Sequence, residues 1–260
     1  LQTATFVGGR FIANYVRDAK SIVRVHGIDG GLVAEVPLPG LGSAAGFAGS
    51  KNSTETFFSY MDFLTPAAIM RYDVAENAVT PFRKPTVAAD FTPYETRQVF
   101  YRSKDGTRIP MFVTRARNAP RDGTQPLLLY GYGGFDVSLT PTFRPATLVW
   151  LEMGGTYVEA NLRGGGEYGE PWHRAGTKLQ KQNVFDDFIA AAEFLIAEKY
   201  TSSARLVING RSNGGLLVGA VLTQRPELFG AALPAVGVLD MLRYHTASAN
   251  ARQWSSDYGL

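Results

Sequence analysis

Ser212 lies in the stretch Gly210-Arg-Ser-Asn-Gly214, which has the G-x-S-x-G spacing of a serine nucleophile. A short apolar run with strand character precedes it, and apolar residues at helical spacing follow. We therefore predict a sharp strand–turn–helix bend that exposes the Ser212 hydroxyl. The flanking glycines would allow close backbone approach, and the N-terminus of the helix would stabilise a developing oxyanion. The alternative is a glycine-rich turn in which Ser212 or Asn213 only caps the helix.

Tyr132 is a second residue that could take part in this chemistry, because it lies in the glycine-rich turn Gly131-Tyr-Gly-Gly-Phe135. The turn follows residues 126–130, which have the pattern of a short buried strand. Hydrolases of the α/β class place an oxyanion donor in such a turn, upstream of the nucleophile. A phenolic hydroxyl can donate the required hydrogen bond. A tight turn with packed aromatic side chains is the other interpretation.

The chain does not supply an obvious general base for Ser212. A serine nucleophile needs a base and a carboxylate that orients the base. His245 is the only histidine after Ser212, and Asp240 and Asp257 are the nearby aspartates. The segment after Ser212 is too short to build the strands that would return a histidine to the serine. We expect His245 on a helix surface or at the site rim, and we expect the triad to be incomplete in this chain.

The elements needed to position these residues form an α/β pattern. Residues 163–169 contain three consecutive glycines without a phosphate-binding pattern, and we expect a surface loop at the mouth of the site. An apolar stripe between Val184 and Ile196 predicts a helix packed on the sheet, with Asp186 and Asp187 favouring the positive end of its dipole. Strands are predicted at residues 95–101, 109–115, 126–130, 156–161 and 229–236.

Residues 1–80 are rich in strand patterns and turn residues, including the hairpin signal Asp29-Gly-Gly31. A weak repeat relates the residues around Tyr15 and Arg24 to those around Tyr60 and Arg71. Short strands that repeat at this spacing indicate β-propeller blades, and an irregular β-sandwich is the alternative. Residues 81–93 contain three prolines and little periodicity, so we predict a linker there.

The composition excludes several classes of protein. The net charge of +3 comes from dispersed Lys and Arg residues, which argues against a nucleic-acid or membrane footprint. The chain has no cysteine, so it has no disulfide framework, and we expect no metal or cofactor. No stretch approaches the length of a transmembrane helix. Because the sequence opens on a strand pattern at Leu1, we expect it to be part of a longer protein.

Several stretches together form a specific pattern, and on them the chain resembles the prolyl oligopeptidase family of α/β-hydrolase serine peptidases. The resemblance covers nearly all of residues 95–260 and, more weakly, the N-terminal part. The stretches are Tyr130-Gly-Tyr-Gly-Gly-Phe135, Asn161-Leu-Arg-Gly-Gly-Gly-Glu-Tyr-Gly169, Trp172-His173, Lys181-Gln-Asn-Val-Phe-Asp-Asp187, Asn209-Gly-Arg-Ser-Asn-Gly-Gly215, Gln224-Arg-Pro-Glu-Leu-Phe229, Val236-Gly-Val-Leu-Asp-Met-Leu242, Trp254 and Asp257-Tyr-Gly259.

The resemblance implies an endopeptidase that cleaves short peptides on the carboxyl side of proline through an acyl-enzyme. Ser212 would be the nucleophile, and the Asn213 backbone N–H and the Tyr132 hydroxyl would form the oxyanion hole. An apolar pocket would hold the proline ring by aromatic stacking. Without the resemblance, plain core packing would be the better interpretation of the pocket residues. They are Phe135, Val238, Trp254 and Tyr258.

The resemblance also implies a domain order. Residues 1–80 would form the C-terminal blades of a seven-bladed propeller, residues 81–93 a linker, and residues 94–260 the N-terminal two-thirds of an α/β-hydrolase domain. The catalytic Asp and His of the family would lie beyond residue 260. We expect the isolated chain to fold poorly and to show no useful turnover. The complete protein is expected to be a monomer in the cytoplasm, although the absence of cysteine fits the periplasm equally well.

One departure from the family keeps an alternative open. Arg211 stands where prolyl oligopeptidases often carry glycine, and Gly-Arg-Ser-x-Gly-Gly also occurs in oligopeptidase B, which cleaves after basic residues. That related family lacks the turn at Tyr132 and the tryptophan expected to stack on proline, so we favour the prolyl enzyme. An esterase of the same fold and an inactive peptide-binding fragment are the remaining alternatives.

Overall fold

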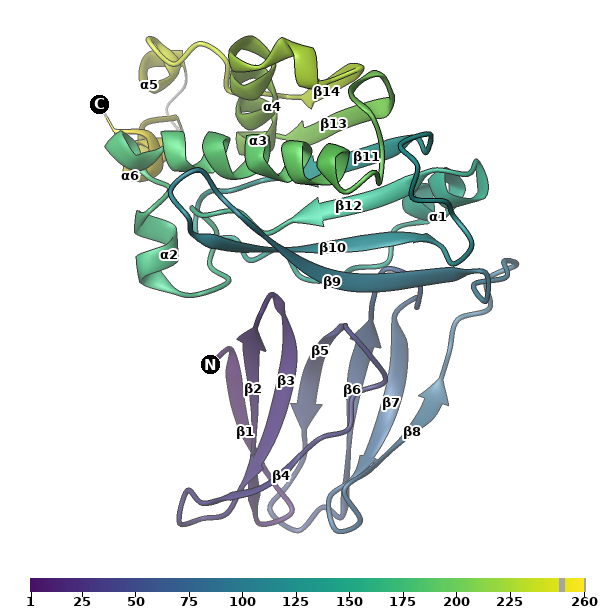
Figure 1. Ribbon diagram of the computed structural model, residues 1–260. Helices are drawn as coiled ribbons and strands as arrows, with labels where there is room; N and C mark the ends of the chain where they lie inside the picture. Colours follow the sequence, from purple (N-terminus) through teal and green to yellow (C-terminus); the bar gives the residue numbers. More distant parts are fainter. Residues whose placement is uncertain (248–250, 260) are drawn as a thin grey trace. The chain divides into compact units, whose positions relative to one another are not determined.

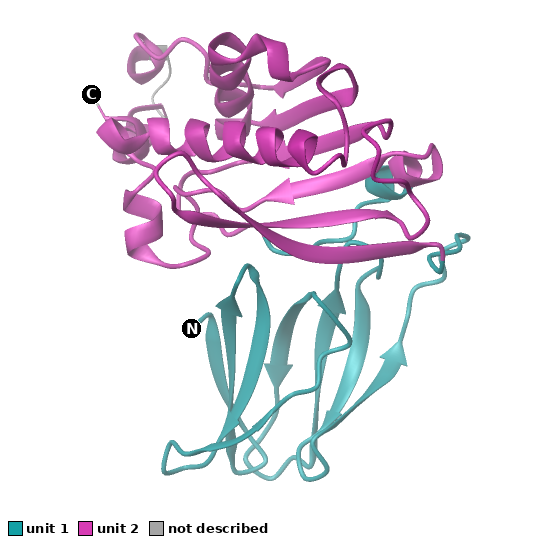
Figure 2. Ribbon diagram, in the orientation of Figure 1, with its two compact units in different colours: residues 1–92, 140–148 teal, residues 93–139, 149–260 magenta. Residues whose placement is uncertain are grey.

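The computed structural model describes residues 1–247 and 251–259 and divides into two compact units (Figures 1 and 2). The first unit contains residues 1–92 and 140–148, and the second contains residues 93–139 and 149–260. Local contacts explain why residues 140–148 group with the N-terminal part. Ser43 donates a hydrogen bond to the Pro141 carbonyl (2.8 Å), and the Phe91 and Phe143 rings meet edge to face.

The first unit is built from two four-stranded antiparallel sheets, each a meander in which neighbouring strands follow one another along the chain. Such meanders are the units from which propeller blades are made. The predicted repeat relates equivalent strands, because Tyr15 and Tyr60 lie on the second strand of each sheet. The strands are β1 (Thr3–Val7), β2 (Arg10–Arg17), β3 (Lys20–His26) and β4 (Leu32–Glu35), then β5 (Ser43–Ala48), β6 (Glu55–Met61), β7 (Ala68–Asp73) and β8 (Ala78–Arg83).

Alternation of buried and exposed residues defines the inner face of these sheets. Along β6 and β7 every second residue is buried, as expected for strands with one face in a core. Phe58 of β6 stacks on Phe47 of β5 with the ring centroids 4.5 Å apart. The two sheets contribute to one apolar cluster, which includes Val7, Ile12, Val23, Val25, Phe58, Tyr60, Met70 and Tyr72.

The second unit is organised around a six-stranded sheet with the order β14-β13-β11-β12-β10-β9. The β9–β10 hairpin turns at Asp105-Gly106, as predicted, and β10 also pairs antiparallel with β12. Strands β12, β11, β13 and β14 are parallel to one another. The strands are β9 (Tyr94–Arg102), β10 (Arg108–Ala116), β11 (Leu127–Gly131), β12 (Thr156–Ala160), β13 (Leu206–Arg211) and β14 (Ala231–Ala235).

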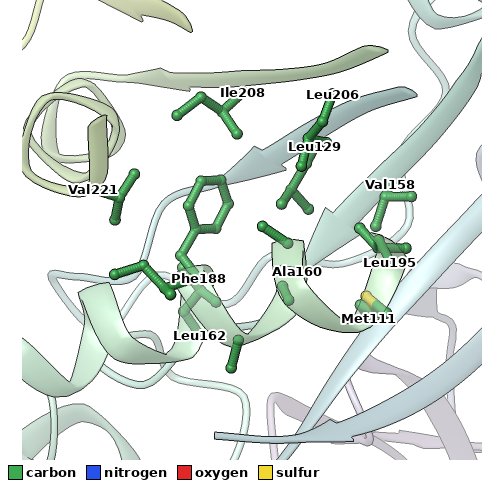
Figure 3. Packing of buried hydrophobic residues seen from close by; sticks show 14 of the residues in the cluster. Met111, Leu129, Val158, Ala160, Leu162, Phe188, Leu195, Leu206, Ile208 and Val221 are labelled. Atoms are coloured by element: carbon green, nitrogen blue, oxygen red, sulfur yellow. The ribbon is translucent and has the colours of Figure 1, made fainter. Parts of the chain in front are cut away.

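The helices include α3 (Gln182–Ala197) and α4 (Asn213–Gln224), which bury apolar faces against this sheet. Figure 3 shows the Phe188 ring of α3 directed toward the strands that carry Leu129 and Ile208. No helix within the described ranges is both long and apolar enough to cross a membrane. The remaining helices are α1 (Pro145–Glu152), α2 (Glu170–Arg174), α5 (Tyr244–Ala247) and α6 (Ser255–Tyr258), with the 3₁₀ turns η1 (Lys178–Gln180), η2 (Ser203–Arg205), η3 (Pro226–Leu228) and η4 (Ala251–Trp254).

The glycine-rich loop expected at the surface is instead largely buried, and the surface prediction was wrong. Arg163 is 5% exposed, and its guanidinium makes a fork of hydrogen bonds with the fully buried Asp187 of α3 at 2.6–3.1 Å. Asp186 and Asp187 both lie beyond the first turn of α3, so neither serves the helix dipole as predicted. A buried carboxylate needs a cationic partner, and the loop supplies it.

Candidate functional site

The site lies where two neighbouring parallel strands end. Strands β11 and β13 pair in register, with Tyr130 opposite Asn209. The turn that carries Tyr132 follows β11, and Ser212 follows β13, so both emerge at the carboxyl edge of the sheet. In α/β sheets this edge is where ligands bind.

Ser212 is exposed and occupies the bend between β13 and α4. Its φ of 59° and ψ of −115° are strained for a residue with a side chain. Hydrogen bonds on both sides hold this conformation. The Ser212 N–H donates to the Ala235 carbonyl (2.9 Å), and the Ser212 carbonyl accepts from the N–H groups of Gly215 and Leu216. The predicted strand–turn–helix bend is therefore present, with its serine facing solvent.

Two glycines make the bend possible because no side chain would fit at their positions. A Cβ at Gly210 would overlap the Gly214 carbonyl on the other side of the bend. A Cβ at Gly214 would lie 2.6 Å from the Gly131 carbonyl oxygen, at the end of β11. The second contact brings the start of α4 against the start of the Tyr132 turn.

Asn213 joins the bend to two other elements. It is 1% exposed, and its side-chain Nδ2 donates to the Tyr132 carbonyl at 2.5 Å. Its Oδ1 accepts a hydrogen bond from the Tyr258 hydroxyl of α6 at 3.0 Å. The Asn213 backbone N–H is among the first amides of α4, which have no acceptor within the helix. This amide is therefore available to an anion beside Ser212, where the helix dipole also favours negative charge.

Tyr132 is half-buried in the turn after β11. Burial and, secondarily, the nearby charge of Asp257 raise the pKa of the Tyr132 phenol above its usual value. The phenol therefore stays protonated at neutral pH and can donate a hydrogen bond to a developing negative charge.

Two charged residues hold the backbone of this turn, and neither was predicted to take part in the site. The Asp257 carboxylate accepts a hydrogen bond from the Phe135 N–H (2.7 Å) and lies 2.9 Å from His173 Nε2. Lys181 Nζ donates to the Gly133 carbonyl at 2.9 Å. Burial lowers the pKa of Lys181 to about 8, although the Asp257 carboxylate opposes this shift. Asp257, His173 and Lys181 all lie in the stretches that carry the family resemblance, which was the available signal.

The buried glycine loop supports the same turn from another side. A Cβ at Gly164 would lie 2.7 Å from the Gly133 carbonyl oxygen, so only glycine allows this approach. The Gly164 carbonyl accepts a hydrogen bond from the Asp136 N–H, and the Gly164 N–H donates to the Trp172 carbonyl. The loop therefore positions the turn.

Of the four residues predicted to form the apolar pocket, only Phe135 and Tyr258 have aromatic rings in contact with each other. The Phe135 and Tyr258 rings meet edge to face with centroids 5.4 Å apart. Trp254 ends η4, directly before α6, and is half-buried. Within the described ranges it takes part in no aromatic contact. Val238 is half-buried in the loop after β14, whose Gly237 lies against Gly215 at the start of α4.

The described residues do not complete a triad. Within residues 1–247 and 251–259, no side chain forms a hydrogen bond with the Ser212 hydroxyl. His245 lies on α5, where its ring contacts that of Tyr244, and His173 is bound to Asp257. The site thus contains a candidate nucleophile and candidate oxyanion donors, and it lacks a base among these residues.

Family models match both parts of the chain. The model for the prolyl oligopeptidase family matches residues 141–259, and the model for the N-terminal β-propeller domain of prolyl oligopeptidase matches residues 1–85. Together with the three sheets, these matches confirm the predicted fold class, an α/β-hydrolase sheet preceded by propeller blades.

Individual relatives agree with the family models. A prolyl endopeptidase of Elizabethkingia meningoseptica is 48% identical over 252 residues, covering 97% of this chain and 36% of the relative. A prolyl endopeptidase of Dictyostelium discoideum is 40% identical, covering 96% of this chain and 33% of the relative. The chain thus spans about a third of the length of these relatives.

Solved structures show the same likeness. A structure from a study of two prolyl endopeptidases superposes with a TM-score of 0.92 at 48% identity, covering 100% of this chain and 38% of the other. A prolyl oligopeptidase B from Galerina marginata, bound to a 35mer hydrolysis and macrocyclization substrate, has a TM-score of 0.92 at 37% identity. The superposition covers 100% of this chain and 37% of the Galerina marginata chain.

Proposed function

Because the chain belongs to the prolyl oligopeptidase family, we propose that the protein carrying it is a serine endopeptidase that cleaves short peptides after proline. In this proposal, the Ser212 hydroxyl attacks the carbonyl carbon of the proline residue. The peptide C–N bond after proline then breaks, the amine of the next residue leaves with a proton, and an acyl-enzyme remains on Ser212. The Asn213 N–H and the Tyr132 phenol donate to the oxyanion of the tetrahedral intermediate. A histidine and an aspartate from another part of the complete protein would act as base and orienting acid.

The observation that carries this proposal is the position of Ser212. It is an exposed serine in a strained bend at the N-terminus of α4, and Asn213 ties that bend to the turn of Tyr132. Strain of this kind costs free energy and is retained at sites of function. A capping serine in an ordinary turn would not need these fixed neighbours.

We also propose that Phe135, Val238, Trp254 and Tyr258 form the pocket for the proline ring. The edge-to-face contact of Phe135 with Tyr258 supports two of these assignments. Aromatic walls suit a flat pyrrolidine because they bury apolar area with little loss of side-chain entropy. The assignment of Val238 and Trp254 rests on the family resemblance and on their places next to Gly237 and α6.

The remaining parts of the proposal concern the whole protein. Residues 1–80 and 94–260 are proposed as propeller blades and hydrolase domain, joined by a linker at 81–93. Strand β8 continues to Arg83, and so the first residues of the linker would still be paired with β7. We further propose a cytoplasmic monomer that acts on short proline-containing peptides and binds no nucleic acid or membrane.

A covalent probe tests the proposed nucleophile. A peptidyl-prolyl diphenyl phosphonate should inactivate the complete protein and phosphonylate the Ser212 hydroxyl with loss of phenol, as located by peptide mass spectrometry. Ser212→Ala should abolish labelling, and exposed Ser50→Ala in the first unit serves as a matched control. Modification of the wild-type protein elsewhere, with Ser212 intact, would exclude the proposed nucleophile.

Matched substrates separate the prolyl enzyme from the alternative, an oligopeptidase B. Two peptides that differ only in Pro or Arg before the scissile bond should be cleaved with a strong preference for Pro. An aromatic pocket provides no carboxylate to pair with a guanidinium. Preference for Arg would assign the protein to the oligopeptidase B type.

A further inference from the structure

Asp257 is a buried carboxylate that the proposed reaction does not use. Its side chain is 1% exposed, and both of its oxygens are engaged, one by the Phe135 N–H and the other by His173 Nε2. Burial of a carboxylate is costly unless hydrogen bonds compensate for the lost hydration. The arrangement thus needs a structural or functional reason, and its position beside the proposed proline pocket suggests one.

The residue that Asp257 holds has a strained backbone. Phe135 has a φ of 57° and the next residue, Asp136, has a φ of 56°. Residues with side chains rarely adopt this region, and they stay there only when their surroundings hold them. The hydrogen bond from the Phe135 N–H to Asp257 at 2.7 Å restrains the orientation of the peptide group before Phe135, and hence the direction of its ring.

Asp257 also connects Phe135 to the opposite side of the pocket. It precedes Tyr258, whose ring meets that of Phe135 at 5.4 Å. The Asp257–Phe135 bond therefore joins the two backbones that present these rings. On the far side of the carboxylate, His173 of α2 anchors Asp257 to a third element.

Other parts of the turn are held without Asp257. Asn213 binds the Tyr132 carbonyl at 2.5 Å, and Lys181 binds the Gly133 carbonyl at 2.9 Å. The backbone around the proposed oxyanion donor thus has its own restraints. A change at Asp257 should act on Phe135 more than on Tyr132.

We propose that Asp257 is a positioning residue for proline specificity, whose carboxylate aligns Phe135 with Tyr258 so that their rings can enclose the prolyl ring of the substrate. This inference rests on the proposed function. Asp257 does not touch the reacting atoms, and it acts through the Phe135 amide. Its loss should therefore weaken discrimination in favour of proline before it weakens the reactivity of Ser212.

The test compares Asp257→Ala, Asp257→Asn and the exposed control Asp122→Ala in the complete protein. Substrates with Pro or Ala before the scissile bond give a Pro/Ala ratio of kcat/KM. A small fluorophosphonate, which does not need the pocket, titrates the active serine. Asn keeps an acceptor for the Phe135 N–H without the charge, and hydrogen bonds to neutral acceptors are weaker.

We expect the Pro/Ala ratio to fall more than about 10-fold in Asp257→Ala, mainly through KM for the Pro substrate. In Asp257→Asn the Pro/Ala ratio should fall about 3-fold, and in Asp122→Ala the ratio should equal that of the wild type. The rate of fluorophosphonate labelling per folded molecule should stay within about 3-fold of the wild-type rate in all variants. General misfolding would instead lower kcat/KM for the Pro and Ala substrates and the extent of labelling together.

An unchanged Pro/Ala ratio in folded Asp257→Ala would overturn this inference and leave the proposed function standing. If Asp257→Ala does not fold, an unchanged ratio in Asp257→Asn has the same meaning. A wild-type protein that labels at Ser212 but does not prefer Pro would refute the proposed function, and the inference would fall with it.

Discussion

At the scale of single residues, the candidate site depends on two side chains that differ in exposure, Ser212 and Tyr132. Ser212 is exposed and strained, and it is free of hydrogen bonds to any described side chain. Tyr132 is half-buried, and burial and the Asp257 charge keep its phenol protonated. A nucleophile must be accessible to a base, whereas an oxyanion donor must stay protonated in a site that excludes water.

Tyr132→Phe tests the proposed oxyanion donor. Removal of the hydroxyl keeps the ring and the turn, so the loss should appear in kcat and leave KM little changed. Loss of one such donor typically raises the barrier by about 3 kcal/mol, or about 100-fold in rate. Steady-state kinetics with a Pro substrate measure the effect, and Tyr15→Phe in β2 is the matched control. Equal kcat values for Tyr132→Phe and wild type would remove Tyr132 from the oxyanion hole.

At the scale of elements, a buried ion pair joins the glycine-rich loop to α3. Arg163 binds Asp187 in the core, and its second terminal nitrogen reaches Asp105 of the β9–β10 turn at 2.5 Å. The loop in turn supports the backbone of Gly133. Loss of the Arg163–Asp187 ion pair should therefore disturb the site by displacing the loop, although neither charged residue contacts Ser212.

Asp187→Ala should lower the free energy of unfolding by about 3–5 kcal/mol, because it leaves the Arg163 charge buried without its main partner. The neighbouring Asp186 is half-buried and bonded to Gln182, so Asp186→Ala should change stability by no more than about 0.5 kcal/mol. Urea denaturation of the complete protein measures both. A similar small effect at the two positions would show that the ion pair is not important for stability.

Glu167, at the end of the same loop, makes stability depend on pH. It is 4% exposed, and burial raises its pKa to about 7, even though the Leu139 N–H and Asn161 bind its carboxylate. The folded state thus holds a proton that the unfolded state releases near pH 4.5. The contribution of Glu167 is full below that pH and is lost as pH rises through about 7.

Glu167→Gln removes this titration while keeping an acceptor for the Leu139 N–H. The variant should be more stable than the wild type at pH 8, by at most about 3 kcal/mol. The difference between the two proteins should shrink toward pH 5. Chemical denaturation at pH 5, 6, 7 and 8 gives the comparison. Parallel pH profiles for the two proteins would contradict this assignment.

At the scale of the whole molecule, one edge of the α/β sheet carries exposed apolar side chains. Strand β14 lies at one edge, and Leu233 and Val236, on it and just after it, are 51% and 67% exposed. Leu239 and Leu242, farther along the same segment, are 57% and 88% exposed. An open strand edge with exposed apolar residues promotes association between molecules.

The isolated 260-residue chain should therefore associate and should not turn over prolyl substrates. Ser212 has no basic partner among the described side chains, so its hydroxyl would attack a substrate carbonyl only slowly. Light scattering, circular dichroism and a fluorogenic prolyl substrate test this on the purified chain. Monomeric, cooperatively folding protein with proline-specific turnover would refute it.

The sequence alone determined the features that depend on local pattern. The bend at Ser212 could be predicted because strand, glycine and helix signals adjoin there. The blade strands could be predicted because alternation and turn residues are local as well. The likeness around Tyr132 and Ser212 was enough to indicate the family, since those stretches combine several specific motifs.

Only the tertiary structure decided which distant side chains hold these features in place. Asp257 reaches Phe135 across 122 positions of the chain, and Arg163 meets Asp187 inside the core. The glycine loop was mistaken for surface because arginine and glutamate are usually exposed and consecutive glycines are typical of surface loops, and local pattern does not reveal buried partners. Compensation of a buried charge is a property of contacts in space, and so the folded arrangement was needed to find the residues that support the site.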